Sequence, residues 1–367
     1  MKSYLLVNAG LEQLTQQDLQ QHYSLSSTSL APNIIECDPS SQTLFSLATH
    51  LQTPRRILIA INKFKTPESI SFSSTTFPFT DFFTNLTTFK IEVENLPGID
   101  NRLALAKIVA GKLYNTFQSI NLNPQIDLKH PQILLVVFYS ADQYFIGIDI
   151  TGFELNSRPY RIFPHQSSFK GDLAYFFARQ SQFQPQKKLL VGFAKDGTLA
   201  IEAAIYASHT PLFDPTSFSC QHFPAWKNLS IPSPTAPPPH SSPTPQIPQI
   251  ISIFDETTQN ITAIRKNSYL AKVDKFLHIS KHSLDELDTK YDPQSFDTII
   301  FHITSKDEEK INDLYYGLDY ILKPLGTVLI ISRPSWEFPL SSKFILIEQK
   351  DLSKGDSIYR TWLLQKK

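Results

Sequence analysis

The stretch with the clearest chemical potential is Leu189–Ala204, where an apolar run is followed by a polar turn and an alanine-rich segment. The pattern predicts a buried strand, a turn at Lys195–Thr198 and a helix over Leu199–Ala207. In the turn, Gly197 suits a positive φ and Thr198 suits a helix cap. Such a turn presents backbone N–H groups and the positive end of a helix to a ligand. A plain connection between a strand and a helix accounts for the same residues.

A second candidate is Asp255, at the carboxyl end of an apolar run over Ile250–Phe254. In an open parallel sheet, ligands bind beyond the carboxyl ends of the strands, where the strand order reverses. A carboxylate in that place can accept hydrogen bonds from two ribose hydroxyls, as in an adenosine-type site. Asp255 can equally cap a helix that begins near Thr257, and the residues alone leave both roles open.

Strands and helices that alternate through the second half of the chain must position these candidates. Helices are predicted over 169–179, 199–207, 259–271 and 310–322, and strands over 189–191, 250–254, 276–279, 296–302 and 327–332. This order predicts an α/β fold with a doubly wound, mainly parallel sheet, closed by a hairpin of 344–348 and 359–364. A segment dense in proline and serine, 230–249, interrupts the order. It predicts an extended loop, either a passive insertion or a docking site for a proline-binding domain.

The first half of the chain has the pattern of two smaller α+β modules. In the first, strands at 4–7, 34–37 and 56–65 alternate with helices at 10–21 and 41–51, which is a ferredoxin-like order. The second has a strand at 89–93, a helix at 101–117, and a hairpin of 132–139 and 144–149. The residues of the 101–117 helix expected to face inward are Leu103, Ala106, Ala110 and Leu113.

The composition bounds the classes of function. Lys+Arg and Asp+Glu balance at 34 each, so nucleic-acid binding requires a local basic patch rather than a global positive field. Two cysteines, Cys37 and Cys220, argue against a disulfide scaffold or a zinc site. The first residues lack the pattern of a secretory leader, and no run reaches the roughly 18 apolar residues of a membrane span. We therefore expect a soluble, cytoplasmic protein of two or three domains, without a metal.

The candidate turn also resembles a family motif. Gly197-Thr198 and Ile201–Ala204 match the second half of D-P-x-C-G-S-G-T-x-x-I-E-A-A, the first motif of RNA methyltransferases that carry a THUMP domain. Asp149–Arg161 resembles that family's D-L-S-G-x-x-L-x-x-R-G-Y-R. Further similarities, which extend the resemblance over nearly the whole chain, are at Gly10-Leu11-Glu12, Arg55-Arg56, Phe223–Trp226, Asp255 and Asn267. Some of these resemble bacterial large-subunit rRNA guanine-N2 methyltransferases.

The resemblance implies a ferredoxin-like domain at 1–65, a THUMP RNA-binding domain at 66–163 and a Rossmann-like class I methyltransferase domain at 164–367. It also implies S-adenosylmethionine as the cofactor and structured RNA as the partner, with large-subunit rRNA methylated on a guanine exocyclic amine. The implied cofactor-binding residues are Gly192, Lys195, Gly197, Thr198 and Asp255. The catalytic candidate is His302, where the family has N-P-P-Y. Phosphate contacts are expected from Arg55, Arg56, Lys107, Lys112, Arg158, Arg161 and Lys170.

Three departures from the family pattern fall on this site. Val191, Gly192 and Lys195 replace the acid, the proline and the first glycine of the first motif. His302–Ser305 replaces N-P-P-Y, and Lys281–Ser283 replaces the acidic residue near the adenine. Lys195 can pair with the methionine carboxylate of the cofactor or clash with the cofactor. Two hypotheses follow, an active rRNA methyltransferase or an RNA-binding relative with a silent methyltransferase domain, and a tRNA-directed methyltransferase is a third.

Overall fold

The computed structural model describes residues 1–367 except 231–232, 234–237, 240–249, 304–308, 336–338 and 355–356. The chain divides into two compact units. The N-terminal unit comprises Met1–Leu155 and Phe213–Ser241, and the C-terminal unit comprises Asn156–Leu212 and Ser242–Lys367. Most of the predicted proline-rich loop at 230–249 lies outside the described residues.

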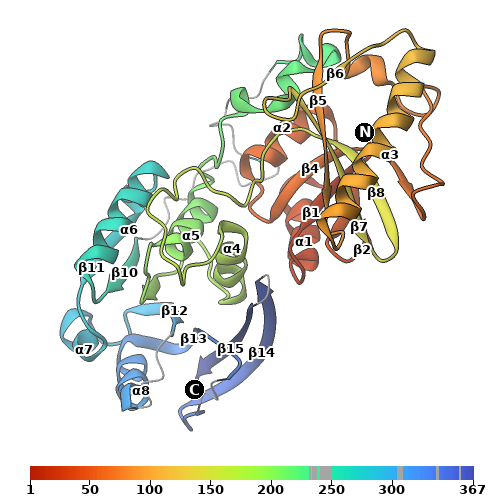
Figure 1. Cartoon of the computed structure of the whole chain (residues 1–367). Helices are drawn as coiled ribbons and strands as arrows, with labels where there is room; N and C mark the ends of the chain where they lie inside the picture. The colour runs from red at the N-terminus through yellow and green to blue at the C-terminus, as the bar shows by residue number, and fades with distance from the viewer. Residues whose placement is uncertain (231–232, 234–237, 240–249, 304–308, 336–338, 355–356) are drawn as a thin grey trace. The chain divides into compact units, whose positions relative to one another are not determined.

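The N-terminal unit is built on one mixed sheet with the strand order β2-β3-β1-β4-β8-β7-β5-β6 (Figure 1). Its strands are β1 Ser3–Val7, β2 Ser27–Ala31, β3 Ile34–Cys37, β4 Pro54–Phe64, β5 Thr88–Glu94, β6 Gln125–Ile126, β7 Ile133–Ser140 and β8 Gln143–Asp149. Its helices are α1 Glu12–Tyr23, α2 Ser41–His50 and α3 Ile99–Ser119, with short 3-10 turns at Phe79–Asp81, Pro215–Ser217, Ser219–His222 and Pro224–Trp226. The predicted strands and helices of this half are confirmed, and strands β2 and β6 are additions.

The sheet crosses the predicted boundary at residue 65. Strand β4 from the first module pairs antiparallel with β8 from the second, with Leu58 opposite Asp149. Strands β7 and β8 form the predicted hairpin, and Ala141 and Asp142 in its turn both have positive φ, as a tight two-residue connection requires. The division into domains at 1–65 and 66–163 stays a prediction.

The predicted inner face of α3 is wrong at its first position. The helix buries Leu105, Val109 and Leu113, whereas Leu103 is 57% exposed. The buried residues follow an i, i+4, i+8 spacing that continues into Phe117. The leucine at 103 suggested a face rotated by about a fifth of a turn from the buried one, and its exposure leaves an outer face that mixes apolar and basic side chains.

The C-terminal unit is a seven-stranded sheet with the order β11-β10-β9-β12-β13-β15-β14 (Figure 1). Its strands are β9 Leu189–Gly192, β10 Ile251–Asp255, β11 Leu277–Lys281, β12 Phe296–His302, β13 Leu322–Ser332, β14 Phe344–Lys354 and β15 Ser357–Lys366. Its helices are α4 Gly171–Gln180, α5 Thr198–Ser208, α6 Thr258–Leu270, α7 Leu287–Lys290 and α8 Glu309–Ile321, with 3-10 turns at Asp274–Phe276 and Leu284–Glu286.

The first five strands are parallel, and the last two form the antiparallel hairpin at one side of the sheet. The predicted doubly wound α/β architecture is therefore confirmed for this unit. Strand β9 lies between β10 and β12, so the strand order reverses beside its carboxyl end. The turn that follows β9 thus occupies the position where such sheets bind ligands. Among the described residues, no helix is long and apolar enough to cross a membrane.

Candidate functional site

The turn between β9 and α5 is built from an unusual run of left-handed residues. Phe193, Lys195 and Gly197 have φ of 53°, 56° and 82°. Glycine adopts this conformation freely, which confirms the prediction for Gly197, whose N–H donates to the Ala194 carbonyl at 2.8 Å. For a residue with a Cβ the left-handed conformation costs about 1–2 kcal/mol. The surrounding contacts must therefore hold Phe193 and Lys195 in place.

The cap of α5 differs from the prediction. The first helical residue is Thr198 itself, and Gly197 occupies the cap position. The capping oxygen belongs to Asp196, whose Oδ1 accepts from Thr198 N at 3.1 Å and from Thr198 Oγ1 at 2.8 Å. Thr198 is therefore a donor to the cap and does not supply it. The Asp-x-Thr spacing is the sequence signal for this arrangement.

The carboxylate of Asp255 is engaged by the protein's own donors. Its Oδ2 accepts from Lys195 N at 3.0 Å. Its Oδ1 accepts from Thr257 N at 3.0 Å, Thr257 Oγ1 at 3.2 Å and Asn260 Nδ2 at 2.9 Å. Thr257 is the N-cap residue of α6, so the helix-start alternative describes this region better than a ribose contact. Asp255 fixes the turn to the start of α6.

The side chain of Lys195 lies inside the site. The residue is only 7% exposed, and its Nζ is 3.5 Å from the carbonyl oxygen of His302 at the end of β12. Burial lowers the pKa of this ammonium below its ordinary value, while the nearby carboxylates of Asp255 and Asp196 oppose part of that shift. A cation therefore lies between the turn after β9 and the end of β12.

Aromatic rings fill the space beside Gly192. A side chain on this glycine would collide with the rings of Phe301 and Phe254, so Gly192 allows the close packing of β9 against its neighbours. Phe193 packs on the same two rings with centroids 5.6 and 5.7 Å away. Phe254 in turn stacks on His282 at 4.3 Å. His282, where the family has an acid near the adenine, is thus part of an aromatic stack.

The cavity at the turn is small. The cavity is bounded by Ser168, Phe169, the 191–199 segment and His302, and the part of it that a water molecule can enter is about 10 Å³, about enough for one water. With Asp255 engaged and Lys195 directed inward, the residues as arranged do not fit S-adenosylmethionine at the turn.

His302, the catalytic candidate, is 6% exposed. Its ring lies against Phe169 at 4.4 Å and 32°, and meets Tyr359 edge-on at 5.9 Å. Such stacking describes a packed core residue at the strand end rather than a side chain directed at a substrate. The following positions of the predicted motif, Thr304 and Ser305, lie outside the described residues.

Arg158 is a structural residue, which corrects the prediction that it contacts RNA. Its side chain and that of Glu202 are both fully buried, and Arg158 Nε is 2.7 Å from Glu202 Oε1. The same oxygen accepts from Tyr160 Oη at 2.6 Å. Burial alone would lower the pKa of Arg158, but the Glu202 carboxylate raises it, so the guanidinium stays charged. Arg158 joins the start of the C-terminal unit to α5 and has no exposed surface for a phosphate.

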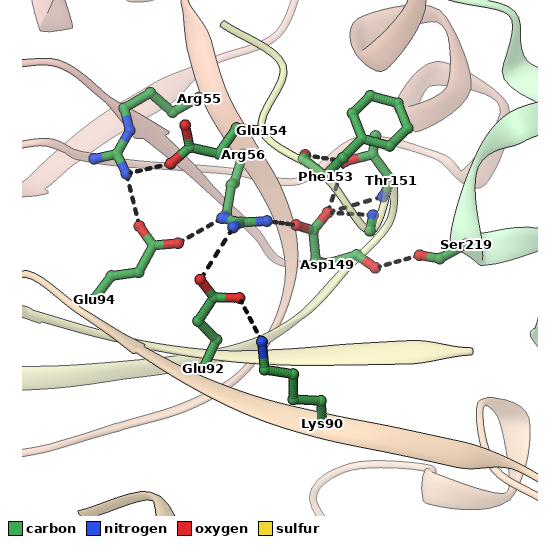
Figure 2. A network of polar contacts seen from close by, with 11 residues as sticks. Arg55, Arg56, Lys90, Glu92, Glu94, Asp149, Thr151, Phe153, Glu154 and Ser219 are labelled. Atoms are coloured by element: carbon green, nitrogen blue, oxygen red, sulfur yellow. Dashed lines mark hydrogen bonds and ion pairs between the residues drawn. The ribbon is translucent and has the colours of Figure 1, made fainter. Parts of the chain in front are cut away.

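Arg56 is likewise an internal residue, and the prediction of a phosphate contact is corrected. Figure 2 shows its guanidinium between carboxylates, with Nη1 2.6 Å from Asp149 and Nε 2.5 Å from Glu94. Glu92 lies 3.7 Å from Nη2. The Arg56 side chain is 5% exposed and that of Asp149 is 0% exposed. The pair joins β4, β5 and β8 across the two predicted modules.

Arg55 and Arg161 are partly exposed but already paired. Arg55 Nη2 lies 2.8 Å from Glu94 and 3.1 Å from Glu154, as Figure 2 also shows. Arg161 Nε lies 3.0 Å from Asp196 Oδ2, so it supports the same aspartate that caps α5. A phosphate would have to compete with these carboxylates for either guanidinium.

The predicted basic residues that are exposed are Lys107 and Lys112 on α3 and Lys170 before α4. Lys107 and Lys112 lie on the exposed part of α3 with the apolar side chains of Leu103 and Ile108, and Arg102 is exposed near the start of the same helix. Both lysines were expected to contact phosphate. Leu103 was predicted to face inward, so the sequence did not indicate that an apolar side chain is exposed on the same helix.

Asn267 on α6 connects the segment before α4 to the turn between β9 and α5. Its Nδ2 donates to the carbonyl oxygens of Phe163 at 3.0 Å and Asp196 at 2.9 Å, and its Oδ1 accepts from Phe163 N at 3.1 Å. Every polar atom of this buried amide is therefore used to support the backbone. Asn267 therefore has a structural role in this unit.

Residues 158–318 match the UPF0020 family model, which is described as the RMKL-like methyltransferase domain. The chain is 26% identical over 214 residues to the Ribosomal RNA large subunit methyltransferase K/L of Legionella pneumophila (strain Philadelphia 1), covering 56% of this chain and 30% of that protein. The protein of the same name from Dichelobacter nodosus is 26% identical over 207 residues, covering 54% of this chain and 28% of that protein. The match thus spans less than a third of either relative.

Solved structures share the fold over the whole chain. TrmN from Thermus thermophilus has a TM-score of 0.68 at 16% identity, covering 100% of this chain and 99% of that chain. SMU.472, solved in complex with SAH, has a TM-score of 0.72 at 14% identity, covering 99% of this chain and 97% of that chain.

The sheet order and the turn at its switch point define the C-terminal unit as Rossmann-like, and residues 158–318 within it are similar to the RMKL-like methyltransferase domain. The sequence relatives are named ribosomal RNA large subunit methyltransferases, so just over half of this chain is similar in sequence to part of such proteins.

Proposed function

We propose that the protein is an RNA-binding relative of the ribosomal RNA methyltransferases whose methyltransferase-type domain has a structural role and does not use S-adenosylmethionine. The observation that carries this proposal is the place of Lys195. Its ammonium is buried and directed at the His302 carbonyl, in the turn where the family motif has glycine.

Charge supports the same proposal. S-adenosylmethionine carries a positive sulfonium at its reactive centre, and a second cation at close range in a poorly solvated site repels it. The carboxylate that would compensate, Asp255, already accepts four hydrogen bonds from Lys195, Thr257 and Asn260. The methionine carboxylate would pair with Lys195 only if the side chain swung away from His302.

Calorimetric titration of the full chain with S-adenosylmethionine and with S-adenosylhomocysteine tests the proposal. We expect no binding of either compound at millimolar concentration. An active ribosomal RNA methyltransferase K/L titrated in the same buffer is the positive control. A dissociation constant in the micromolar range for this chain would refute a silent domain.

The second candidate is an active methyltransferase that modifies a guanine exocyclic amine of large-subunit rRNA. The seven-stranded sheet and the match over 158–318 favour it, because the scaffold around the turn is intact. Transfer of a labelled methyl group from S-adenosylmethionine to rRNA would establish this function, and transfer to tRNA instead would establish the tRNA-directed alternative. Absence of transfer to both, together with retained RNA binding, supports the silent relative.

We further propose that residues 66–163 act as a THUMP-type RNA-binding domain, with the outer face of α3 as part of the contact surface. Exposed Lys107 and Lys112 supply positive charge there, and Arg102 is exposed near the start of the same helix. Lys170, which is also exposed, supplies a further positive side chain before α4. Because Arg56 and Arg158 are buried, and a phosphate would have to compete with carboxylates for Arg55 and Arg161, we place the RNA contact on these exposed lysines instead.

A further inference from the structure

Helix α6 in the C-terminal unit has a basic outer face. The helix packs against β10 and β11, and its residues Ile261 and Ile264 are buried, whereas Arg265 and Lys266 are exposed. The helix contains no aspartate or glutamate, and the stretch without acidic residues extends from 257 to 273. In a chain whose charges balance over its whole length, α6 therefore carries a local excess of positive charge.

Neither of these two cations is held by a carboxylate. Within the described part of the chain, Arg265 and Lys266 form no ion pair, in contrast to Arg161. Lys266 Nζ lies 4.5 Å from the centroid of the Phe163 ring, which is a cation–π contact. The side chain of Asn267 bonds to both backbone polar groups of Phe163, so this ring keeps its place beside the helix. A phosphate can therefore approach both cations without displacing an acid.

An exposed aromatic ring completes this face. Tyr269 is 72% exposed. It follows Arg265 by four residues and Lys266 by three, and these spacings make side chains neighbours on the surface of a helix. A ring with so much exposed surface can receive a planar ligand. Surfaces that bind single-stranded nucleic acid combine such rings, on which bases stack, with cations that contact the phosphates.

We propose that the outer face of α6, formed by Arg265, Lys266 and Tyr269, binds single-stranded RNA. One base stacks on Tyr269, and the adjacent phosphates contact the two cations. This inference rests on the RNA binding proposed above and assigns part of that binding to the C-terminal unit. The contact needs no S-adenosylmethionine, so a methyltransferase-type domain with a silent cofactor site retains a binding role.

The chemistry of this face favours RNA over a protein or a membrane. Lysine is depleted from the cores of protein interfaces, and a helix that lies in a membrane surface needs a large apolar face. The other exposed residues of α6 are Thr258, Gln259, Thr262 and Leu270. Three of these four side chains are polar, so charged and hydrogen-bonding groups dominate the face.

Fluorescence anisotropy of the full chain with a labelled single-stranded RNA oligonucleotide, at several salt concentrations, tests the stacking. Tyr269→Ala should weaken binding by about 5- to 150-fold, which corresponds to the loss of one stacked base. The slope of log affinity against log salt should not change, because no charge is removed. Tyr269→Phe keeps the ring and should bind as the native chain does. Tyr316→Ala, at a 65% exposed position on α8, is the matched control.

The cations are tested by the slope itself. Arg265→Ala/Lys266→Ala should reduce it by about 0.7 for each phosphate contact that is lost. Lys63→Ala/Lys65→Ala removes two exposed lysines at and just after the end of β4, and should keep the native slope. All of these side chains are exposed, so circular dichroism should show the native fold for every variant.

The possible outcomes separate this inference from the proposed function. If the native chain binds RNA and the Tyr269→Ala and Arg265→Ala/Lys266→Ala variants bind it equally well, the α6 surface is wrong and RNA binding stands. If the native chain binds no RNA, the proposed function fails as well. Binding of the native chain to anionic lipid vesicles that Tyr269→Ala abolishes, with RNA affinity unchanged, would assign this face to a membrane surface instead.

Discussion

A single side chain changes what the first-motif turn can do. Glycine at position 195 would leave the backbone open to a ligand, whereas Lys195 fills the space between the turn and His302 and holds a left-handed conformation. The hydrogen bond from the backbone N–H of residue 195 to Asp255 does not depend on the side chain, since glycine has the same donor. The lysine side chain thus changes the charge and the volume of the site.

Replacing Lys195 by glycine should reverse these effects. We expect Lys195→Gly to raise the free energy of unfolding by about 1 kcal/mol, because it relieves a left-handed lysine, and to allow detectable binding of S-adenosylhomocysteine. Lys195→Met, which removes the charge but keeps the bulk, is the matched variant and should not bind. Urea denaturation and calorimetry measure the two effects. Binding by the methionine variant as well would assign the obstacle to charge alone.

His282 should make stability depend on pH. Burial against Phe254 lowers the pKa of His282 below its ordinary value of about 6.5. As the pH falls below that value, the unfolded chain binds the proton first, so the free energy of unfolding decreases. The decrease from this group is at most about 1.4 kcal/mol per pH unit. In urea denaturation between pH 7.5 and 5.5, the native chain should lose more stability than His282→Gln, and parallel profiles would contradict the assignment.

At the scale of elements, buried ion pairs join segments that are far apart in the sequence. Arg56 on β4 reaches Glu94 on β5 and Asp149 at the end of β8 (Figure 2). Arg158 does the same for the start of the C-terminal unit and Glu202 on α5. Removing one member of a buried pair leaves an uncompensated charge, which is costly even where the intact pair adds little.

Two adjacent arginines allow a direct comparison. Arg56→Met should lower the free energy of unfolding by roughly 3–5 kcal/mol, because Asp149 stays buried without its partner. Arg55→Met should cost about 1 kcal/mol or less, since its side chain is 21% exposed and water can solvate Glu94 and Glu154. Urea denaturation of both variants gives the comparison. Equal losses would mean that the network acts as a whole rather than through its buried pair.

The elements could be predicted from the sequence, but the partners of their charged residues could not. Apolar periodicity located β9, α5, β10 and the closing hairpin, because those residues are buried on fixed spacings. Strand β2 was missed because its sequence, Ser27–Ala31, is polar and forms a half-exposed edge. Arg56 and Arg158 were predicted to contact RNA because their buried partners are far away in the sequence. Glu202 lies 44 residues from Arg158, and Asp149 lies 93 residues from Arg56. Sequence spacing does not show such contacts.

At the scale of the whole molecule, zero net charge restricts how the chain can bind RNA. With 34 basic and 34 acidic residues, no general field attracts a polyanion. Several of the arginines are also neutralised by buried or partly buried carboxylates. If the chain binds RNA as proposed, its affinity must therefore come from a few exposed side chains.

The lysines on α3 test that expectation. Lys107→Ala/Lys112→Ala should weaken RNA binding, and each phosphate interaction that the variant removes should reduce the slope of log affinity against log salt by about 0.7–0.9. Lys275→Ala/Lys290→Ala changes the net charge equally on the C-terminal unit and is the control. Fluorescence anisotropy with an rRNA fragment at several salt concentrations gives the slopes. An unchanged slope in the α3 variant would exclude this helix from the RNA surface.

The division of the chain into units also has a consequence for its synthesis. The polypeptide leaves the N-terminal unit at Leu155, passes through Asn156–Leu212 of the other unit, and returns with Phe213–Ser241. Phe223 and Trp226 of the returning segment pack on Phe82 and Phe45. During synthesis on the ribosome, the N-terminal unit therefore cannot complete its fold until β9 and α5 of the other unit, and then Phe213–Ser241, have been made. Neither unit is one contiguous stretch of the chain, so a gene cut at residue 155 or 163 would yield two incomplete proteins.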